Sequence, residues 1–327
     1  MMSFEKRASG ALAKAGTFFR QIAENPALNR AKPVFSRLVL FLILGLVGWQ
    51  LYSIGITEIL KNLPVHPLFY ILFVLTFFSL PLAEVFIYRQ VWDVPRRHLF
   101  GRLLKKKVFN DEVAGYSGEV FLSLWAKNYL GLGHREAIKN VRDNNILSAL
   151  SNNSAALLLL GGISVFGIVD LSSYFGEVSL WQWVAGGLAA VLLTGLFFSF
   201  RRYLFALPAK KAAKVFSIYF SRFILHNGMM IMLWAVVIPE VAFQTWLLFV
   251  TVMIVLNRIP LLPSRDLVFL MVGIELSKTF EVATASMAGM LLVYSALKKG
   301  TNLGIYLWLS WREKKRAKEA AGPVSEP

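Results

Sequence analysis

A glutamate inside a long apolar run constrains the fold of this chain more than any other feature. Glu84 lies within residues 69–91, and about 20 mostly apolar residues are enough to cross a bilayer. An ionised carboxylate at the bilayer centre costs on the order of 3 kcal/mol on insertion scales. Such a side chain faces a polar cavity or a partner, or forms a packing hydrogen bond to a neighbouring helix. The run therefore predicts a membrane protein with a polar interior.

The composition agrees with a membrane protein. Of the 327 residues, 56% are hydrophobic and 14% aromatic, and the mean hydropathy is +0.57, which is too apolar for a soluble domain of this length. The absence of cysteine excludes disulfides, thiolate metal sites and a cysteine nucleophile. The four histidines lack the spacing of metal ligands. We therefore expect neither a metal nor a cofactor.

The positive charge lies next to the apolar segments. The formal net charge is +16, and 26 of the 35 lysines and arginines fall in four clusters, at residues 6–37, 89–107, 201–214 and 298–318. Each cluster abuts a hydrophobic segment, as expected for cytoplasmic loops under the positive-inside rule. This placement favours both termini in the cytoplasm and argues against a nucleic-acid partner.

The hydrophobic segments predict an all-α, polytopic integral membrane helix bundle of about eight transmembrane helices. Residues 38–310 form the predicted transmembrane domain, followed by a charged cytoplasmic tail at residues 311–327, of which residues 320–327 are predicted to be disordered. Residues 1–37 form a basic segment without a signal peptide, either an amphipathic interfacial helix or a frayed tail. A short loop with Glu58 and Lys61 separates the first two spans. The predicted spans are residues 38–54, 68–91, 145–169, 181–200, 215–238, 241–256, 266–280 and 282–297.

Two segments are irregular. Residues 108–133 contain four glycines and Glu119, which indicates a re-entrant pair or an interfacial helix buried against protein, with a plain cytoplasmic loop as the alternative. Residues 258–281 contain Pro260 and Pro263 and are re-entrant or a broken helix. Paired interruptions of this kind indicate a membrane transport site.

Polar residues at the span entrances are candidate ligands. Arg142 and Asp143 precede a span and, as neighbours on a helix, point in different directions, so each is free for another partner; an N-cap role for Asp143 is the alternative. Arg222 and His226 are four residues apart and share one helix face. An inward Arg222 suits a phosphate or carboxylate, whereas an outward one snorkels to the surface.

The proline-containing segment adds two candidates. Arg258 is either a ligand for an anion or a cytoplasmic anchor. Glu275 and Lys278 are three residues apart and neutralise one another if they face the same way. No nucleophile elbow, zinc-binding helix or phosphate-binding glycine loop is present, so we expect no enzymatic activity.

The order of several motifs resembles a known family. Across residues 38–309, the chain resembles the membrane region of lysylphosphatidylglycerol synthases and the related YbhN-like bacterial membrane proteins. The matching elements are residues 88–92 (Tyr-Arg-Gln-Val-Trp), Gly118-Glu119, Arg142-Asp143, and Pro260 with Pro263. The family's glycine-rich run with a following glutamate is replaced by Ser264-Arg265-Asp266, so Glu275 is a displaced counterpart of that glutamate. The soluble aminoacyl-transfer domain is absent from the sequence.

This resemblance implies lipid flipping in the bacterial inner membrane, without lysyl transfer. We expect an anionic lipid or lipid-linked head group as ligand, attracted by Arg142, Arg222 and Arg258. Three carboxylates would shape the cavity or carry a coupling proton: Glu84, Glu119 and Glu275. One alternative is a lipid-modifying enzyme with Glu119 and Asp143 as acid and base. The other is a scaffold whose basic cytoplasmic face recruits partners or anionic lipid.

Overall fold

The computed structural model describes residues 41, 45, 48, 49, 51–112, 116–165, 207–257, 265–280 and 282–321. All regular secondary structure in these ranges is helical, which confirms the all-α prediction for this part of the chain. Residues 1–37, the predicted span 181–200, Arg258, Pro260 and Pro263 lie outside the described residues. The described helices are α3 (Ile56–Lys61), α4 (Pro67–Tyr88), α5 (Arg96–Glu112), α6 (Ser117–Leu130), α7 (His134–Val165), α11 (Ala209–Val237), α12 (Phe243–Leu256), α13 (Arg265–Thr279) and α14 (Thr284–Ala321).

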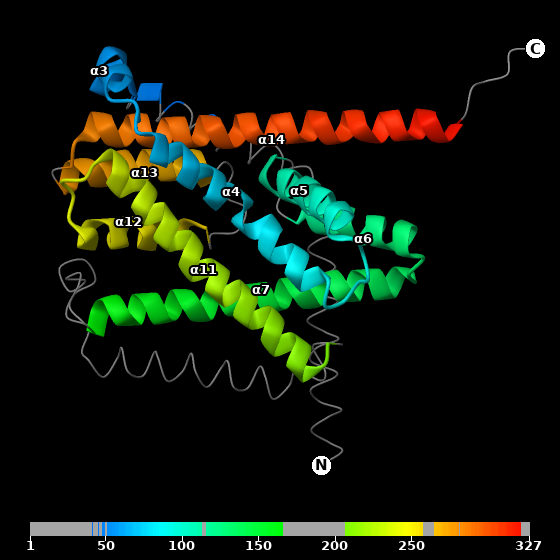
Figure 1. Cartoon of the computed structure of the whole chain (residues 1–327). Helices are drawn as coiled ribbons and strands as arrows, with labels where there is room; N and C mark the ends of the chain where they lie inside the picture. The colour runs from blue at the N-terminus through cyan, green and yellow to red at the C-terminus, as the bar shows by residue number, and fades with distance from the viewer. Residues whose placement is uncertain are drawn as a thin grey trace, which may run out of the picture.

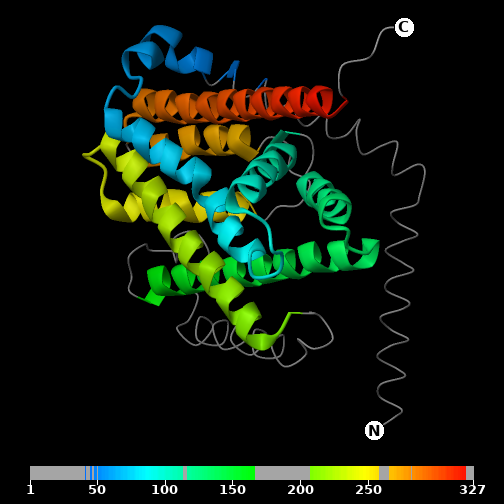
Figure 2. The same ribbon diagram turned by 45° about the vertical axis from the view of Figure 1, so that its right-hand side comes forward.

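Two long helices lie on opposite sides of two others, which cross between them. In Figure 1, α14 runs along one side and α7 along the opposite side, while α4 and α11 cross diagonally between them. Helix α11 packs along α4 and across α7. The turned view in Figure 2 separates the α5–α6 hairpin, which lies between α14 and the start of α7, and α13 lies beside α14. Helices far apart in sequence therefore surround a common centre.

Helix α4 begins at a proline and has one buried and one exposed apolar face. Pro67 occupies the first helical turn, where its missing N–H costs nothing, and the preceding His66 accepts a hydrogen bond from the backbone N–H of Leu68 at 3.2 Å. One face packs into the core through buried residues such as Phe69 and Phe73. The opposite face is apolar yet exposed, at Tyr70, Ile71, Val74, Leu75, Leu82 and Phe86.

Two helices are long and apolar enough to cross a membrane, judged by length and composition. They are α4, with 22 residues, and α11, with 29 residues. Helix α12 is also apolar but has only 14 residues. Like α4, helix α11 leaves large apolar side chains exposed, at Ile224, Leu225 and Met232. Exposed apolar faces on helices of this length fit contact with lipid better than contact with water.

The main core lies where α11, α12 and α13 meet. Trp234 of α11 packs against Trp246 of α12, with ring centroids 5.8 Å apart. It also stacks on Phe269 of α13 at 5.7 Å. Phe249 of α12 contacts both tryptophans edge-on. A smaller core joins the end of α4 to α5, α6 and α7 around Leu103 and Leu122. These two cores hold the helices that line the centre of the molecule.

Helical structure extends beyond several of the predicted segments. The loop predicted around Glu58 and Lys61 contains helix α3, which packs on α14: a Cβ on Gly289 would lie only 2.9 Å from the Asn62 carbonyl oxygen. Helix α7 begins at His134, well before the predicted span at residue 145. Helix α14 continues through residues 311–321, where a separate tail was predicted, and includes Ala320 and Ala321 of the segment predicted to be disordered. Contacts with other helices stabilise charged stretches that lack an apolar run of their own.

An ionic clamp fixes the distal part of α14 against α5. One carboxylate oxygen of Glu313 accepts a hydrogen bond from Lys105 at 2.6 Å, and the other accepts one from Arg102. The two cations also lie over aromatic rings, Arg102 over Trp125 and Lys105 over Phe121. Burial alone would raise the pKa of Glu313, but the hydrogen bonds and charges of Lys105 and Arg102 hold it below its ordinary value.

This clamp predicts a pH-dependent position of the α14 end. Because the folded pKa is lowered, the contact is present at neutral pH and is lost as the pH falls through that lowered value. Spin labels on Lys127→Cys and Ser310→Cys, in a chain without native cysteine, should give a narrow distance distribution at neutral pH that broadens in acid. The added substitution Glu313→Gln should broaden the distribution at every pH. A distribution that is equally narrow in all samples would contradict the clamp.

Candidate functional site

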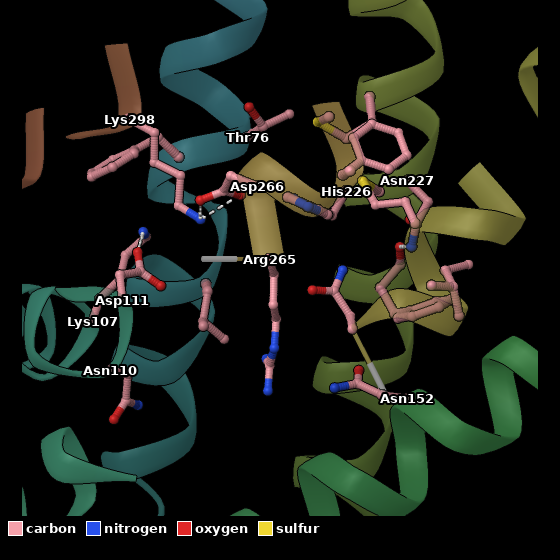
Figure 3. A pocket seen from close by; sticks show the side chains of 18 of the residues that line it. Thr76, Lys107, Asn110, Asp111, Asn152, His226, Asn227, Arg265, Asp266 and Lys298 are labelled. Atoms are coloured by element: carbon pink, nitrogen blue, oxygen red, sulfur yellow. Dashed lines mark hydrogen bonds and ion pairs between the residues drawn. The ribbon is translucent and has the colours of Figure 1, made fainter. Parts of the chain in front are cut away.

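A polar cavity of about 430 Å³ lies among α4, α5, α6, α7, α11, α12, α13 and α14. Its described lining contains nine ionisable side chains besides histidine and tyrosine: Glu84, Lys106, Lys107, Asp111, Glu119, Arg222, Arg265, Asp266 and Lys298. Figure 3 shows Arg265 projecting between the group Lys107, Asp111, Asp266 and Lys298 on one side and the polar residues His226, Asn227 and Asn152 on the other. The cavity therefore gathers opposite charges from helices distant in sequence.

A buried charge triad occupies one part of the lining. Lys106 of α5 forms an ion pair with Glu84 of α4 and lies 3.3 Å from Glu119 of α6. The side chains of Glu84 and Lys106 are each 5% exposed, and that of Glu119 is 14% exposed. Asn110 donates a hydrogen bond to Glu119 at 3.1 Å, while the second carboxylate oxygen of Glu119 is buried and has no hydrogen-bond partner among the described residues. The ammonium group of Lys106 thus interacts with two carboxylates.

Helix periodicity places Lys106 in the interior. Leu99, Leu103 and Lys106 follow the spacing of one face of α5, and all three are buried. The lysine stem packs like its apolar neighbours, and its ammonium group lies 5.7 Å from the ring centroid of Tyr88. Burial works against the charged form of Lys106, but Glu84 and Glu119 outweigh it and raise the pKa of this ammonium group. Lys106 is therefore held as a cation.

Gly118 allows α6 to approach α5 closely enough for this contact. A Cβ at this position would lie 2.1 Å from the carbonyl oxygen of Lys106 and 2.8 Å from the side-chain oxygen of Asn110. The Gly118 backbone N–H also donates to that Asn110 oxygen at 2.8 Å. The glycine before Glu119 thus fixes the carboxylate at the cavity wall.

Replacing Gly118 with alanine is expected to lower the free energy of unfolding by about 1–3 kcal/mol, as overpacking does elsewhere. The added methyl group must push α6 away from the backbone of α5. Thermal and denaturant unfolding of the purified chain would measure the loss. Gly300→Ala is the matched control, because a Cβ there meets no atom within 4 Å. Equal stability of the two variants would show that the close approach is unimportant.

A second charged group lines the same cavity. Lys107 pairs with Asp111 of the same helix, and Lys298 of α14 donates to both oxygens of Asp266 of α13, at 3.0 and 2.9 Å. Asn302 of α14 donates to Asp111 at 3.3 Å. Burial would raise the pKa of Asp111, but Lys298 and Lys107 hold it below its ordinary value. This group joins α5, α13 and α14 through polar contacts.

Helices α7 and α11 supply the remaining polar wall. Asn145, Ser148 and Asn152 lie on one face of α7 and line the cavity. Arg222 and His226 of α11 both line it, which confirms the prediction that they share one face. His226 contacts the Ser79 hydroxyl of α4 at 3.2 Å. Arg222 forms no ion pair among the described residues, and its buried Nε has no hydrogen-bond partner.

Some of the predicted site residues line the cavity and others do not. Glu84, Glu119 and Arg222 line the same cavity. Arg142 and Asp143 do not line it; instead of pointing apart, they form an ion pair at 2.8 Å. This pair lies inside α7, so Asp143 is not an N-cap.

Neither Glu275 nor Arg258, the two candidates from the proline-containing segment, is among the described residues that line the cavity. Glu275 pairs with Lys278 at 3.0 Å, and the two side chains are 64% and 46% exposed, so Glu275 does not contribute to the cavity. The pairing itself was predicted from the spacing. Arg258 lies outside the described residues.

Sequence reasoning missed several lining residues. Lys106 and Lys107 were assigned to a cytoplasmic basic cluster, although the spacing from Leu99 and Leu103 places Lys106 on the apolar face of α5. Lys298 likewise continues the face of Leu291 and Tyr294 on α14. A basic run next to a span fits the positive-inside rule whether or not one of its lysines faces the interior of the bundle. Only helix periodicity indicated that Lys106 and Lys298 face the interior.

The site carries no assignment from known proteins. No family model, curated protein or solved structure matches the chain. The resemblance to lysylphosphatidylglycerol synthases therefore stays a prediction. Across the ranges that the structure describes, no three His, Asp or Glu side chains are grouped as a metal site.

Proposed function

We propose that this protein is a polytopic inner-membrane protein that binds an anionic lipid or lipid-linked head group and moves it across the bilayer. One observation carries the proposal: Glu84, Lys106, Glu119 and Arg222 line a common cavity between helices whose outer faces are apolar. The lining of this cavity is rich in charged and polar side chains, while the outer faces of these helices are apolar.

The cavity lowers the main energy barrier to moving a head group across the bilayer. A charged head group loses its hydration when it enters hydrocarbon, and this loss costs several kcal/mol or more. Fixed charges and amide groups along a cavity replace the lost water contacts. At about 430 Å³, the cavity has the volume of a small-molecule site, for which about 300–1,000 Å³ is typical. A head group fits this space while its acyl chains remain among lipid tails.

The topology belongs to the same proposal. About eight crossings with both termini in the cytoplasm would place the four basic clusters on one side of the membrane. The two long apolar helices, α4 and α11, supply two of these crossings, and both line the cavity. The resemblance to lysylphosphatidylglycerol synthases points to the same class of activity.

The geometry favours transport over the two alternatives. An enzyme using Glu119 and Asp143 as acid and base needs both at one substrate, but Asp143 does not line the cavity that contains Glu119. A scaffold acting through its basic surface would have no use for a buried triad of ionisable groups, which is costly to form. Transport uses the cavity directly.

A liposome assay tests this function. The full chain is reconstituted into vesicles that contain a fluorescent-head-group phosphatidylglycerol, and a membrane-impermeant quencher is added outside. Flipping makes the inner-leaflet fraction accessible, so fluorescence should fall below the plateau seen in protein-free vesicles. The same assay is repeated with other anionic lipids and with phosphatidylcholine. Identical plateaus with and without protein for every lipid would remove the proposal.

A further inference from the structure

The lysines of the cavity already have carboxylate partners. Lys106 pairs with Glu84 and lies near Glu119, Lys107 pairs with Asp111, and Lys298 pairs with Asp266. A ligand anion at any of these lysines would have to share the ammonium group with a carboxylate that already neutralises it. The lysines therefore serve the structure of the cavity wall.

The two arginines of the described lining differ from these lysines in their partners. Neither Arg222 of α11 nor Arg265 of α13 forms an ion pair within the part of the chain that the structure describes. Arg222 is half-buried, and its Nε is shielded from water and has no acceptor among the residues that the structure describes. A buried donor without an acceptor is costly, so a ligand that supplies one gains affinity. Arg265 is exposed, and Figure 3 shows its side chain extending into the cavity.

The charges of the described lining leave one positive charge uncompensated. Five cations, two arginines and three lysines, face four carboxylates, with His226 counted as neutral. The triad has two carboxylates but one lysine, so in this count the charge of Arg222 offsets the charge of one carboxylate, although the two groups are not in direct contact. A ligand with one negative charge would neutralise the cavity, whereas a ligand with two would leave it negative.

We propose that the cavity binds a singly charged phosphodiester, held between Arg222 of α11 and Arg265 of α13. This inference rests on the proposed function, because the diester would be that of a lipid head group. Guanidinium groups present paired N–H donors that match phosphate oxygens and hold their charge at all physiological pH values. Asn145, Asn152 and Asn227 line the same cavity and supply amide groups for the hydroxyls of a head group.

Calorimetric titration of the full chain, in a sugar detergent free of phosphate, tests the site. The probes are glycerophosphoglycerol, a soluble diester with one negative charge; glycerophosphocholine, a diester without net charge; and inorganic phosphate. We expect glycerophosphoglycerol to bind at least about tenfold more tightly than the other two. Arg222→Gln and Arg265→Gln should each weaken its binding about tenfold or more, the loss that follows removal of a charged hydrogen bond. Arg97→Gln is the matched control, because Arg97 is exposed on α5 and does not line the cavity.

Several binding results would overturn the inference. Equal or tighter binding of inorganic phosphate would identify free phosphate as the ligand, and equal binding of glycerophosphocholine would refute the charge argument. Wild-type affinity in both glutamine variants would refute the site. Should Arg222→Gln fail to fold, Arg265→Gln decides, since that side chain is exposed. Arginine-dependent binding without flipping in liposomes refutes only the proposed function; flipping at wild-type rate in both variants refutes only this inference.

Discussion

Replacing Lys106 with methionine is expected to lower the free energy of unfolding by about 3–5 kcal/mol, because it leaves the buried Glu84 and the partly buried Glu119 without their counter-ion. Methionine keeps the length of the stem, so lost charge and not lost volume would cause the change. Denaturant unfolding in detergent would measure it, and the yield of monodisperse protein should fall in parallel. We expect this to be the largest loss of stability among single substitutions of the cavity lining.

Two comparisons isolate the charge effect. Lys127→Met removes an exposed lysine on α6 and should change stability little. The triple variant Lys106→Met, Glu84→Gln, Glu119→Gln removes all three charges and should recover much of the loss, because an uncompensated buried charge is the costly species. A loss under about 1 kcal/mol for Lys106→Met alone, or no recovery in the triple variant, would show that the triad is not a coupled unit.

Asn152→Trp is expected to reduce head-group flipping at least about tenfold, because the indole ring would fill part of a cavity of about 430 Å³. The liposome assay with phosphatidylglycerol measures the rate. Asn153→Trp is the matched control: it places the same ring one residue later on α7, at an exposed position that does not line the cavity. Stability should change little in either variant, since the hydrogen bond from Asn152 to Ser148 is long, at 3.4 Å.

The comparison of the two tryptophan variants bears on function and not on fold. Comparable flipping by both would show that head groups take another route, and comparable loss in both would point to a general disturbance of α7. Reduced flipping by Asn152→Trp alone supports a path through the cavity. Binding of glycerophosphoglycerol by the same two variants should follow the same order as their flipping rates.

The sequence predicted the helices better than their ends. Apolar runs identified α4 and α12 with boundaries close to the observed ones, because a run of this length folds as a helix wherever it is buried. They also identified α11, which begins six residues before the predicted start at residue 215. The start of α7 and the distal part of α14 were missed. Both are charged stretches whose helical state depends on packing, as in the contact of Glu313 with Arg102 and Lys105.

The sequence alone determined that Glu84 needs a partner, because a carboxylate in an apolar run is costly wherever the run is buried, and that Arg222 and His226 face one direction, because helical periodicity is local. Only the tertiary structure decided that the partner is Lys106, through the packing of α5 against α4. It likewise placed Glu119 at the same lysine and Glu275 away from the cavity. Pairing between helices depends on which faces meet, and no local pattern in a single chain specifies that.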